Sequence, residues 1–371
     1  MKHKSTRRDF LKGKAAAEAM VDRAQEGLVS GGTGGALLGP TNEAYLVRVS
    51  REAMACEFEV CLRAGQYPHG TEAALDALEL LETLEAQMSV FRPKGTISEV
   101  NRSAAEAPVT LEPWLFELLQ QADRLSEETD GALDLTAGRL SDLWGFSRRA
   151  EAVPTQAQIA EARQYVGRHL VELDPARSTI RLKKPGVKLN LGSIGKGYAL
   201  DRVAEELEAQ GIVDFLIQGG QSSVLARGHS MGGTENAAKD SSGGWTVGVA
   251  HPLRPGQRLA EIRLNDRALG TSGSARQFFR YQGRRFSHLL DPRTGWPAEG
   301  VLSVTVLAPT AATADGLATA LFVSGPERSE AFCRDHADLG ILWVCPGTAR
   351  GRIEIHATGI PEADLRILGD R

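Results

Sequence analysis

The most constraining stretch of the chain runs from Phe286 to Thr319, where three patterns follow one another directly. It begins with the polar segment FSHLLDPRTGWPAEG, in which the Pro-Arg-Thr-Gly sequence is typical of a turn. Residues 301–308 are rich in Val, Leu and Thr and end at a proline, which predicts a buried strand. Residues 310–322 have the composition of a helix, for which Thr313 is the candidate N-cap residue. The local chain path in this stretch is therefore predicted as turn, buried strand and helix.

Two oxygen-bearing side chains of the predicted helix, Asp315 and Thr319, are four residues apart. A helix places residues at this spacing on one face, one turn apart. A carboxylate beside a hydroxyl near a helix start suits Mg²⁺ or Ca²⁺, because these ions take oxygen ligands. The simpler alternative is that Asp315, in the first turn, complements the helix dipole and that Thr319 only packs. For this pair in isolation the simpler alternative is favoured, so the rest of the chain must decide.

Composition excludes several classes of protein. The chain has 371 residues and a formal net charge of −4 at pH 7, with ordinary apolar and charged fractions. These values indicate a globular protein of one large or two moderate domains, without the basic footprint of a nucleic-acid-binding protein. No apolar run approaches the length of a transmembrane span. The cysteines lack metal-ligand spacing: Cys56 and Cys61 fall in a strand-like run, and a disulfide between Cys333 and Cys345 stays open.

The N-terminal segment, 1–43, is predicted to be a tail and linker that precedes a folded domain at 44–371. Its beginning, TRRDFLK, resembles a twin-arginine export signal, which favours a periplasmic location or the outer face of the inner membrane. An export signal also needs an apolar h-region, whereas residues 12–23 carry several charges, so a cytoplasmic location stays open. Residues 30–40 are rich in glycine, as in a flexible linker.

Elsewhere the pattern predicts strands in runs rather than in strict alternation with helices. Apolar residues at helical spacing predict amphipathic helices at 72–87 and 113–128. Because the strands are grouped, an α+β fold with a mixed or antiparallel sheet is favoured over a doubly wound one. The predicted strands lie near 45–62, 88–91, 169–174, 179–185, 213–218, 222–226, 245–250, 259–264, 276–287, 340–344 and 352–356, and further helices lie near 156–165 and 326–336.

A second unusual stretch is VKLNLGSIGKGYALDRVAEELEAQG, in which a short apolar strand leads through a Gly-rich turn into a helix. The turn contains Ser193, Gly195, Lys196 and Gly197. Strand, Gly-rich turn and helix together can cradle a phosphate, because free N–H groups at a helix start attract anions. The spacing is not that of a P-loop or of GxGxxG. A tight turn that simply needs glycines is an equal alternative.

Seven blocks occur in a fixed order along the chain: MSVFRPKGTISEVN, GALDLTAGRLSDLWGF, LNLGSIGKGYALD, IQGG, TSG, HLLDPRTGWP and TAATADGLATALFVSGPE. In order and spacing they resemble the FAD:protein FMN transferase family, also called the thiamine-biosynthesis lipoprotein (ApbE-like) family, over about residues 45–360. The resemblance implies an α+β fold that binds FAD with Mg²⁺. It further implies transfer of FMN to a Thr or Ser hydroxyl of an acceptor flavoprotein, with release of AMP, and a periplasmic setting.

The resemblance also implies the roles of particular residues. His288 and Asp291 match the block linked to catalysis, and a histidine suits a general base because its unperturbed pKa lies near neutrality. The matched metal positions are Ser193, Asp315 and Thr319. The matched FAD contacts are Met54, Phe91, Ala132, Leu133, Asp134, Asn190, Lys196 and Leu290.

The chain departs from the family pattern at three places. Asn190 stands where an Asp is usual, Ala55-Cys56 replaces Gly-Thr, and Gln221 stands where an Asp is common. Two alternatives stay open beside the transferase. Nothing in the sequence separates it from an FAD pyrophosphatase that uses water as the acceptor. A flavin-binding protein without turnover is weakly favoured by Asn190, whereas Asp315, Thr319 and His288 argue against it.

Overall fold

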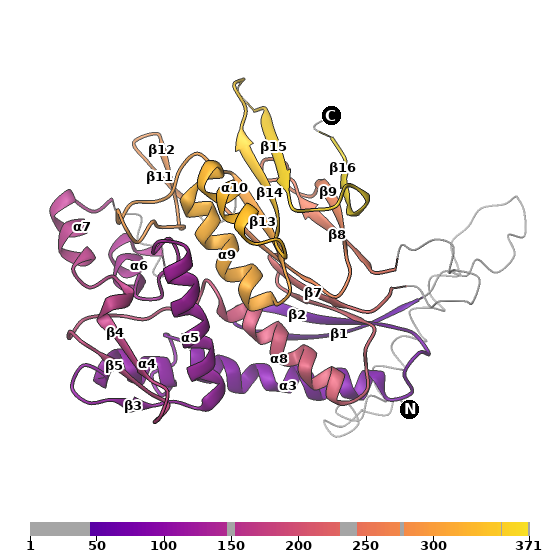
Figure 1. Cartoon of the computed structure of the whole chain (residues 1–371), viewed down its shortest axis with the longest axis horizontal. Helices are drawn as coiled ribbons and strands as arrows, with labels where there is room; N and C mark the ends of the chain where they lie inside the picture. Colours follow the sequence, from indigo (N-terminus) through magenta and orange to yellow (C-terminus); the bar gives the residue numbers. More distant parts are fainter. Residues whose placement is uncertain (1–44, 147–152, 231–242, 275–277, 350, 370–371) are drawn as a thin grey trace, which may run out of the picture. The chain divides into compact units, whose positions relative to one another are not determined.

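The computed structural model describes residues 45–146, 153–230, 243–274, 278–349 and 351–369 (Figure 1). These residues belong to one unit, Ala44–Arg371. The predicted tail at 1–43 lies outside the described residues, and so does the central part of the loop predicted at 228–244. In the described part of the chain, no helix combines the length and apolarity that a membrane crossing requires.

An eight-stranded antiparallel sheet runs through the unit, in the order β1-β2-β6-β7-β10-β13-β14-β15. All six residues of β13 are buried, which confirms the buried strand predicted near 301–308. The antiparallel pairing confirms the predicted α+β class. The strands of this sheet are β1 (Leu46–Ala53), β2 (Cys56–Arg63), β6 (Phe215–Gly219), β7 (Ser223–Arg227), β10 (Ala268–Gly273), β13 (Ser303–Ala308), β14 (Gly340–Pro346) and β15 (Ile353–Thr358).

Three helices pack on one face of this sheet: α3 (Gly70–Met88), α8 (Gly195–Ala209) and α9 (Ala311–Ser324) (Figure 1). The α3 helix packs against β1 and α8, and α8 in turn packs against α9, which lies over β10 and β13. Ten of the fourteen residues of α9 are buried. A helix with apolar residues on all sides belongs inside a core, and this is why α9 can carry side chains into the interior.

The opposite face of the sheet carries a smaller three-stranded sheet, β16-β9-β8. Its strands are β8 (Trp245–Ala250), β9 (Arg258–Leu264) and β16 (Leu365–Ile367). A second apolar cluster joins Trp245 and Ile262 of this sheet to Val224, Leu269 and Leu342 of the large sheet. Burial of both faces explains why β13 is buried along its whole length and β14 over its first five residues.

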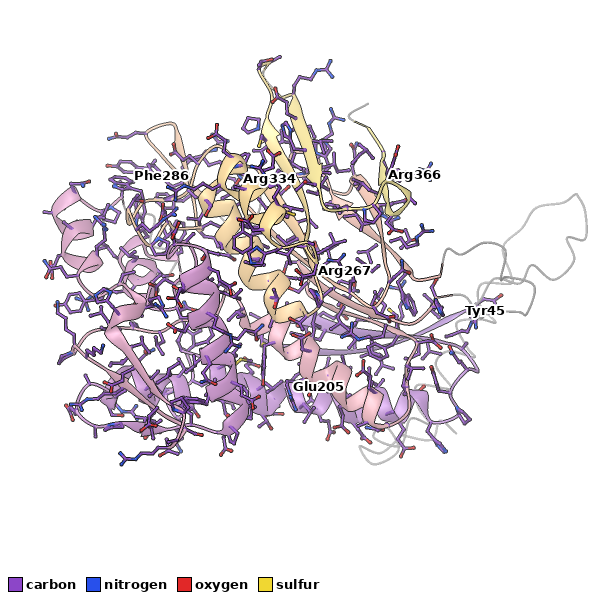
Figure 2. The ribbon with its side chains drawn as sticks, viewed as in Figure 1. Tyr45, Glu205, Arg267, Phe286, Arg334 and Arg366 are labelled. Carbon is purple, nitrogen blue, oxygen red and sulfur yellow. The ribbon has the colours of Figure 1, made fainter. Side chains whose placement is uncertain are left out.

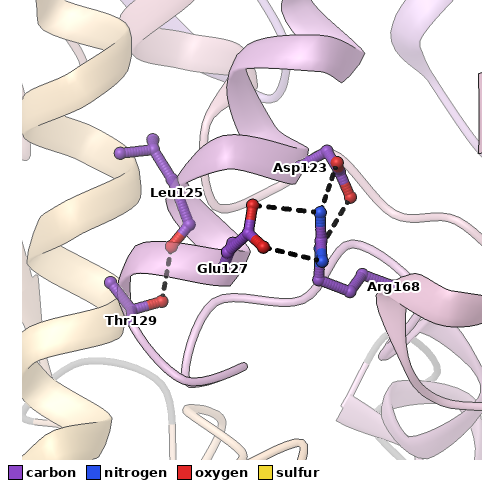
Figure 3. A network of polar contacts seen from close by, with 5 residues as sticks. All are labelled: Asp123, Leu125, Glu127, Thr129 and Arg168. Atoms are coloured by element: carbon purple, nitrogen blue, oxygen red, sulfur yellow. Dashed lines mark hydrogen bonds and ion pairs between the residues drawn. The ribbon is translucent and has the colours of Figure 1, made fainter.

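The remaining elements form a lobe that joins the helical face. They are α4 (Thr96–Ser103), β3 (Val109–Thr110), α5 (Pro113–Glu128), α6 (Gly138–Trp144), α7 (Gln156–Arg163), η2 (Arg168–Leu170), β4 (Val171–Asp174), β5 (Thr179–Leu182), β11 (Phe278–Tyr281) and β12 (Arg284–Ser287), with α10 (Pro326–Asp335) and η4 (Glu362–Asp364) elsewhere. Figure 3 shows how η2 is tied to α5: Arg168 bonds Asp123 through Nε (3.0 Å) and Nη2 (2.8 Å), and also reaches Glu127. Two parallel bonds to one carboxylate fix orientation as well as distance.

Several predictions made from the sequence are wrong in detail. The N-cap residue of α9 is Thr310 rather than Thr313, and Asp315 lies beyond the first turn. Residues 276–287 do not form one strand, because the chain reverses at Gln282-Gly283, where φ is 48° and 78°. No strand forms at 88–91, since α3 continues to Met88 and a turn follows.

The cysteines are all free thiols, so the disulfide left open between Cys333 and Cys345 is not formed. Cys61 is buried as expected for a core strand, whereas Cys56 is only half-buried.

Candidate functional site

Two side chains hold the first turn of α9. The Thr310 hydroxyl accepts a hydrogen bond from the Thr313 N–H (3.3 Å). The Asp201 carboxylate, on α8, accepts from the N–H groups of Ala311 (2.7 Å) and Ala312 (2.8 Å). Burial raises the pKa of Asp201 to about 6, although the two backbone bonds oppose the increase. These bonds satisfy N–H groups that a helix start leaves unpaired, so α8 determines where α9 begins.

Asp315 lies one turn further along α9 and is almost completely buried, with 5% of its surface exposed. Its Oδ2 accepts a hydrogen bond from the Gly197 N–H in the first turn of α8 (3.0 Å). Its Oδ1 accepts from the Ser223 hydroxyl at the start of β7 (2.9 Å), and Lys196 Nζ lies 3.9 Å from the same oxygen. A buried carboxylate is tolerated only when it is hydrogen-bonded or paired, and these three groups meet that requirement.

Lys196 links this carboxylate to a pair of serines. Its ammonium group donates to Ser222 Oγ (2.6 Å) and lies 3.4 Å from Ser223 Oγ. As the second residue of α8, Lys196 adds a full charge to the positive end of the helix dipole. Buried carboxylate, ammonium group and helix start together form the charge pattern of a site that takes an anion and a metal ion at once.

Glycines allow the elements around Asp315 to approach closely. A Cβ at Gly197 would lie 2.0 Å from the Ala311 carbonyl oxygen, and one at Gly270 in β10 would lie 2.5 Å from that of Ala314. Gly197 is thus required for packing, as the simpler interpretation of the Gly-rich turn predicted. Its N–H group also donates a hydrogen bond to Asp315, so packing and site geometry depend on the same residue.

Thr319 follows Asp315 by one turn, and its Oγ1 lies 3.1 Å from Ser272 Oγ at the end of β10. Ser193 is half-buried in the turn that precedes α8. The described residues contain no group of three or more His, Cys, Asp and Glu side chains that could hold a metal. An ion here would therefore depend on Asp315, on hydroxyls and on the oxygens of its ligand. That donor set fits a hard cation such as Mg²⁺ rather than zinc.

A pocket of about 270 Å³ opens near the turn after α3. It is lined by Val90, Phe91, Gly138, Asp142, Lys188, Leu189 and Asn190. Phe91 is 73% exposed, so its ring presents apolar surface to a flat ligand. Asn190 Oδ1 accepts from the Gly192 N–H (2.9 Å). An Asp would make the same short-range bond, so the Asn found here preserves the turn while removing a charge.

Met54 and Ala55 form the two-residue turn between β1 and β2, with φ of 51° and 60°. Positive φ at both central positions is the type I′ turn, which favours Gly or Asn over Ala. The next residue, Cys56, lies against Gly220. Burial raises the pKa of its thiol, whereas the charge of Lys196 lowers it. Gly220 precedes Ser222 by two residues, and Ser222 accepts a hydrogen bond from Lys196, so this turn lies near the Asp315 group.

Ala132 and Leu133 are each 1% exposed, and Leu133 packs beneath Gly316 of α9. Asp134 Oδ1 accepts from both the N–H (2.8 Å) and the hydroxyl (2.6 Å) of Thr136. Burial raises the pKa of Asp134, and the bonds to Thr136 oppose it. Asp134 lines a separate cavity of about 30 Å³ rather than the pocket of Phe91. The side chains of Ala132, Leu133 and Asp134 therefore pack or form hydrogen bonds within the fold.

His288 and Asp291 lie in the segment between β12 and β13. Both carboxylate oxygens of Asp291 accept from Arg293, at 2.9 Å from Nε and 3.0 Å from Nη2. The Asp291 carbonyl oxygen accepts from the Gly295 N–H (2.7 Å). Asp291 thus shapes the turn that follows His288.

This turn is anchored to a cluster of aromatic side chains. Trp144 Nε1 donates to the Gly295 carbonyl oxygen (2.9 Å), and the Trp144 and Trp296 ring centroids are 5.4 Å apart. Leu290 packs on the same cluster, which includes Phe279 and Phe286. Phe286, labelled in Figure 2, belongs to β12 and pairs with Phe279 of β11. The SDLWGF and HLLDPRTGWP segments are therefore neighbours in space.

Comparison with known proteins decides the family. Residues 54–343 match the family model described as the ApbE family. The chain belongs to the ApbE family. An FAD:protein FMN transferase of Haemophilus influenzae is 33% identical over 297 residues, which cover 77% of this chain and 83% of the relative. One from Vibrio cholerae is 34% identical over 256 residues, or 68% of this chain and 73% of the relative.

Solved ApbE structures share the fold. The ApbE protein of Thermotoga maritima has a TM-score of 0.73 and 29% identity, and the comparison covers 84% of this chain and 96% of that one. The flavin transferase ApbE of Vibrio cholerae has a TM-score of 0.72 and 30% identity, covering 85% and 97%. The α+β fold that the resemblance implied is confirmed.

Within this ApbE fold, the structure brings together some of the predicted residues. Lys196, Asp315 and Thr319 meet where α8, α9, β7 and β10 converge, whereas Phe91 and Asn190 line the pocket near α3. Sequence reasoning missed four polar residues at this convergence: Asp201, Ser222, Ser223 and Ser272. Asp201 carried a usable signal, because it follows Gly197 by four residues and so lies on the same face of α8.

Proposed function

We propose that the protein transfers the FMN part of FAD to a Thr or Ser hydroxyl of an acceptor protein and releases AMP. The observation that carries this proposal is the group around Asp315, where one buried carboxylate meets a lysine, hydroxyls and a helix start. This group lies in a chain of the ApbE family, whose curated relatives are named FAD:protein FMN transferases.

Binding would be divided between the two parts of the site. Asp315 and Thr319, together with Ser193, would hold Mg²⁺, which when bound polarises a phosphate and neutralises its charge. Lys196 and the start of α8 would bind phosphate oxygens. The exposed ring of Phe91 would cover one face of the flavin. The remaining proposed contacts are Met54, Ala132, Leu133, Asp134, Asn190 and Leu290.

In the proposed reaction, the acceptor hydroxyl oxygen forms a bond to the FMN phosphorus while the bond from that phosphorus to the AMP oxygen breaks. His288 takes the proton of the attacking hydroxyl, since an imidazole nitrogen can act as a general base. Asp291 acts as a positioning residue, because both of its carboxylate oxygens already accept hydrogen bonds from Arg293.

The test is incubation with FAD, Mg²⁺ and a candidate acceptor, followed by intact mass of the acceptor and an assay for AMP. Transfer adds the FMN mass to the acceptor and releases AMP in equal amount. Free FMN with AMP and an unmodified acceptor would instead identify a pyrophosphatase, and absence of AMP would identify a flavin-binding protein. FAD should also bind more tightly than FMN, because the phosphate site gains from the second phosphate. Equal affinity in a fluorescence titration would count against the proposal.

Localisation is a separate proposal, based on the TRRDFLK segment in the N-terminal residues. We expect residues 1–43 to export a fused reporter weakly at best, because the apolar region of an export signal is missing. Efficient periplasmic delivery of the reporter would contradict that expectation.

A further inference from the structure

One segment of the chain has a charge that contrasts with the rest. Residues 267–290 contain five Arg, one His and no Asp or Glu, although the whole chain has a net charge of −4. The β11–β12 hairpin occupies the centre of this segment. It forms a two-stranded sheet of its own, apart from the larger sheets.

The two faces of the hairpin differ in character. Phe279 pairs with Phe286 across the strands, and both rings are buried in the cluster around Trp144. Since side chains alternate along a strand, the paired Arg280 and Arg285 lie on the other face. Phe278 shares that face: the Arg285 guanidinium lies 3.9 Å from the Phe278 ring centroid, and the ring residue is 38% exposed. We call Phe278, Arg280 and Arg285 the arginine face.

The positive charge of this face is not compensated by the described part of the chain. Arg280 and Arg285 stand directly opposite each other, a like-charge pairing that destabilises a sheet. Among the described residues neither forms an ion pair, and Arg285 Nε is buried without a hydrogen-bond partner. Burial and the neighbouring Arg280 both lower the pKa of Arg285. Binding of an anionic partner would relieve the repulsion between the two guanidinium groups.

The arginine face borders the proposed reaction centre. The chain leaves that centre at Ser272, which contacts Thr319, and two residues later the Ser274 carbonyl oxygen accepts a hydrogen bond from Arg285. The chain returns at His288, three residues after Arg285. Three extended residues span at most about 10 Å, so a partner on the arginine face would be held beside His288.

We propose that the arginine face docks an acidic segment of the acceptor protein, next to the hydroxyl that receives FMN. This inference rests on the proposed function and names the chemistry of the partner. Guanidinium groups bind carboxylates through paired hydrogen bonds, and the exposed Phe278 ring adds apolar contact area. An acidic acceptor would also be attracted over distance by two arginines that form no ion pair with the described residues.

The experiment compares two fluorescent peptides that share a central Thr, one flanked by Asp and Glu and the other by Asn and Gln. The full-length protein should bind the acidic peptide at least about tenfold more tightly than the neutral one. R280E/R285E should abolish this preference. R280E alone should reduce it while keeping the hydrogen bond from Arg285 to the Ser274 carbonyl oxygen. The matched control is R177E/R181E, which reverses two exposed arginines on the β4–β5 hairpin and should keep the preference.

Several outcomes would overturn the inference. The arginine face does not dock the acceptor if the acidic peptide binds no better than the neutral one, or if R280E and R280E/R285E keep the preference. Binding to phosphatidylglycerol vesicles that depends on these arginines, without any peptide preference, would assign the face to a membrane instead. FAD titration of the same samples separates the two proposals. If the unmodified protein binds FAD normally but shows no peptide preference, only the docking proposal fails. If the unmodified protein does not bind FAD, the proposed function itself fails.

Discussion

Replacing Asp315 with Ala should destabilise the fold as well as remove activity. Both carboxylate oxygens accept hydrogen bonds in a buried site, from the Gly197 N–H and the Ser223 hydroxyl. Each bond to a charged acceptor is worth about 1.5–3 kcal/mol. Removing a buried charge regains part of its desolvation cost, so the free energy of unfolding should fall by roughly 2–4 kcal/mol. This exceeds the ~0.3–1 kcal/mol of a helix-dipole contribution alone.

The Asp315→Asn variant separates the two roles of this residue. The amide keeps one acceptor oxygen for Ser223 or Gly197, so the loss of stability should be less than half of that in Asp315→Ala. The charge that would hold Mg²⁺ is gone, so AMP release should fall by orders of magnitude in both variants. Urea unfolding measures the first effect, and AMP release against Mg²⁺ concentration measures the second.

Two results would refute this reasoning. An Asp315→Ala protein whose free energy of unfolding is unchanged would show that the two hydrogen bonds do not support the fold. An Asp315→Asn protein with normal AMP release and the same Mg²⁺ dependence would show that the metal is bound elsewhere.

Three further substitutions test the surroundings of the site. Gly197→Ala should cost about 3 kcal/mol or more, because its Cβ would lie 2.0 Å from the Ala311 carbonyl oxygen; an unchanged melting temperature would contradict the close approach of α8 and α9. Ala55→Gly should raise the free energy of unfolding by about 0.5–1 kcal/mol, because φ is 60° there; a lower urea midpoint would contradict it. Burial raises the pKa of Asp201 from 3.8 to about 6, so the folded state favours its protonated form. Stability should therefore fall by up to roughly 3 kcal/mol as the pH rises from about 4 to about 6. Asp201→Asn should lack this slope, and parallel urea-unfolding profiles from pH 4 to 7 would show that Asp201 does not titrate there.

Hydrophobic periodicity was sufficient to predict most elements that build the core. The helices expected at 72–87 and 113–128 are α3 (Gly70–Met88) and α5 (Pro113–Glu128). The buried strand expected near 301–308 is β13, which lies between β10 and β14 in the interior of the sheet. Such elements are predictable because each buries a continuous apolar face.

The errors came from places where tertiary contacts override local pattern. Thr310 caps α9 because Asp201, distant in sequence, takes two of the first N–H groups. The β11–β12 reversal uses a Gln at φ 48°, a conformation that composition does not predict. The α6 helix was not expected, because it is short and has a glycine at each end. It is held by a tertiary contact, the bond from Trp144 to the Gly295 carbonyl oxygen, which local pattern does not predict.

The sequence predicted only part of the candidate site, because tertiary contacts supply the rest. The spacing of Asp315 and Thr319 placed both on one helix face, as found. Their partners lie far away in the chain: Ser223 begins β7, and Ser272 lies near the end of β10. Only the pairing of β7 with β10 brings these strands together. Their contribution therefore depends on sheet topology, which spacing alone does not encode.

The order of strands in the large sheet has a consequence for how the protein folds. Gln218 of β6 bonds Glu59 of β2 across 159 residues, and the far end of the sheet is β15, at Ile353–Thr358. Contacts between segments so distant form slowly, because loop-closure entropy must be overcome before they stabilise the chain. During synthesis, Asp315 leaves the ribosome only after most of the sheet. FAD should therefore be captured in the last, slow phase of refolding, and a stopped-flow flavin signal should lag behind the recovery of helix.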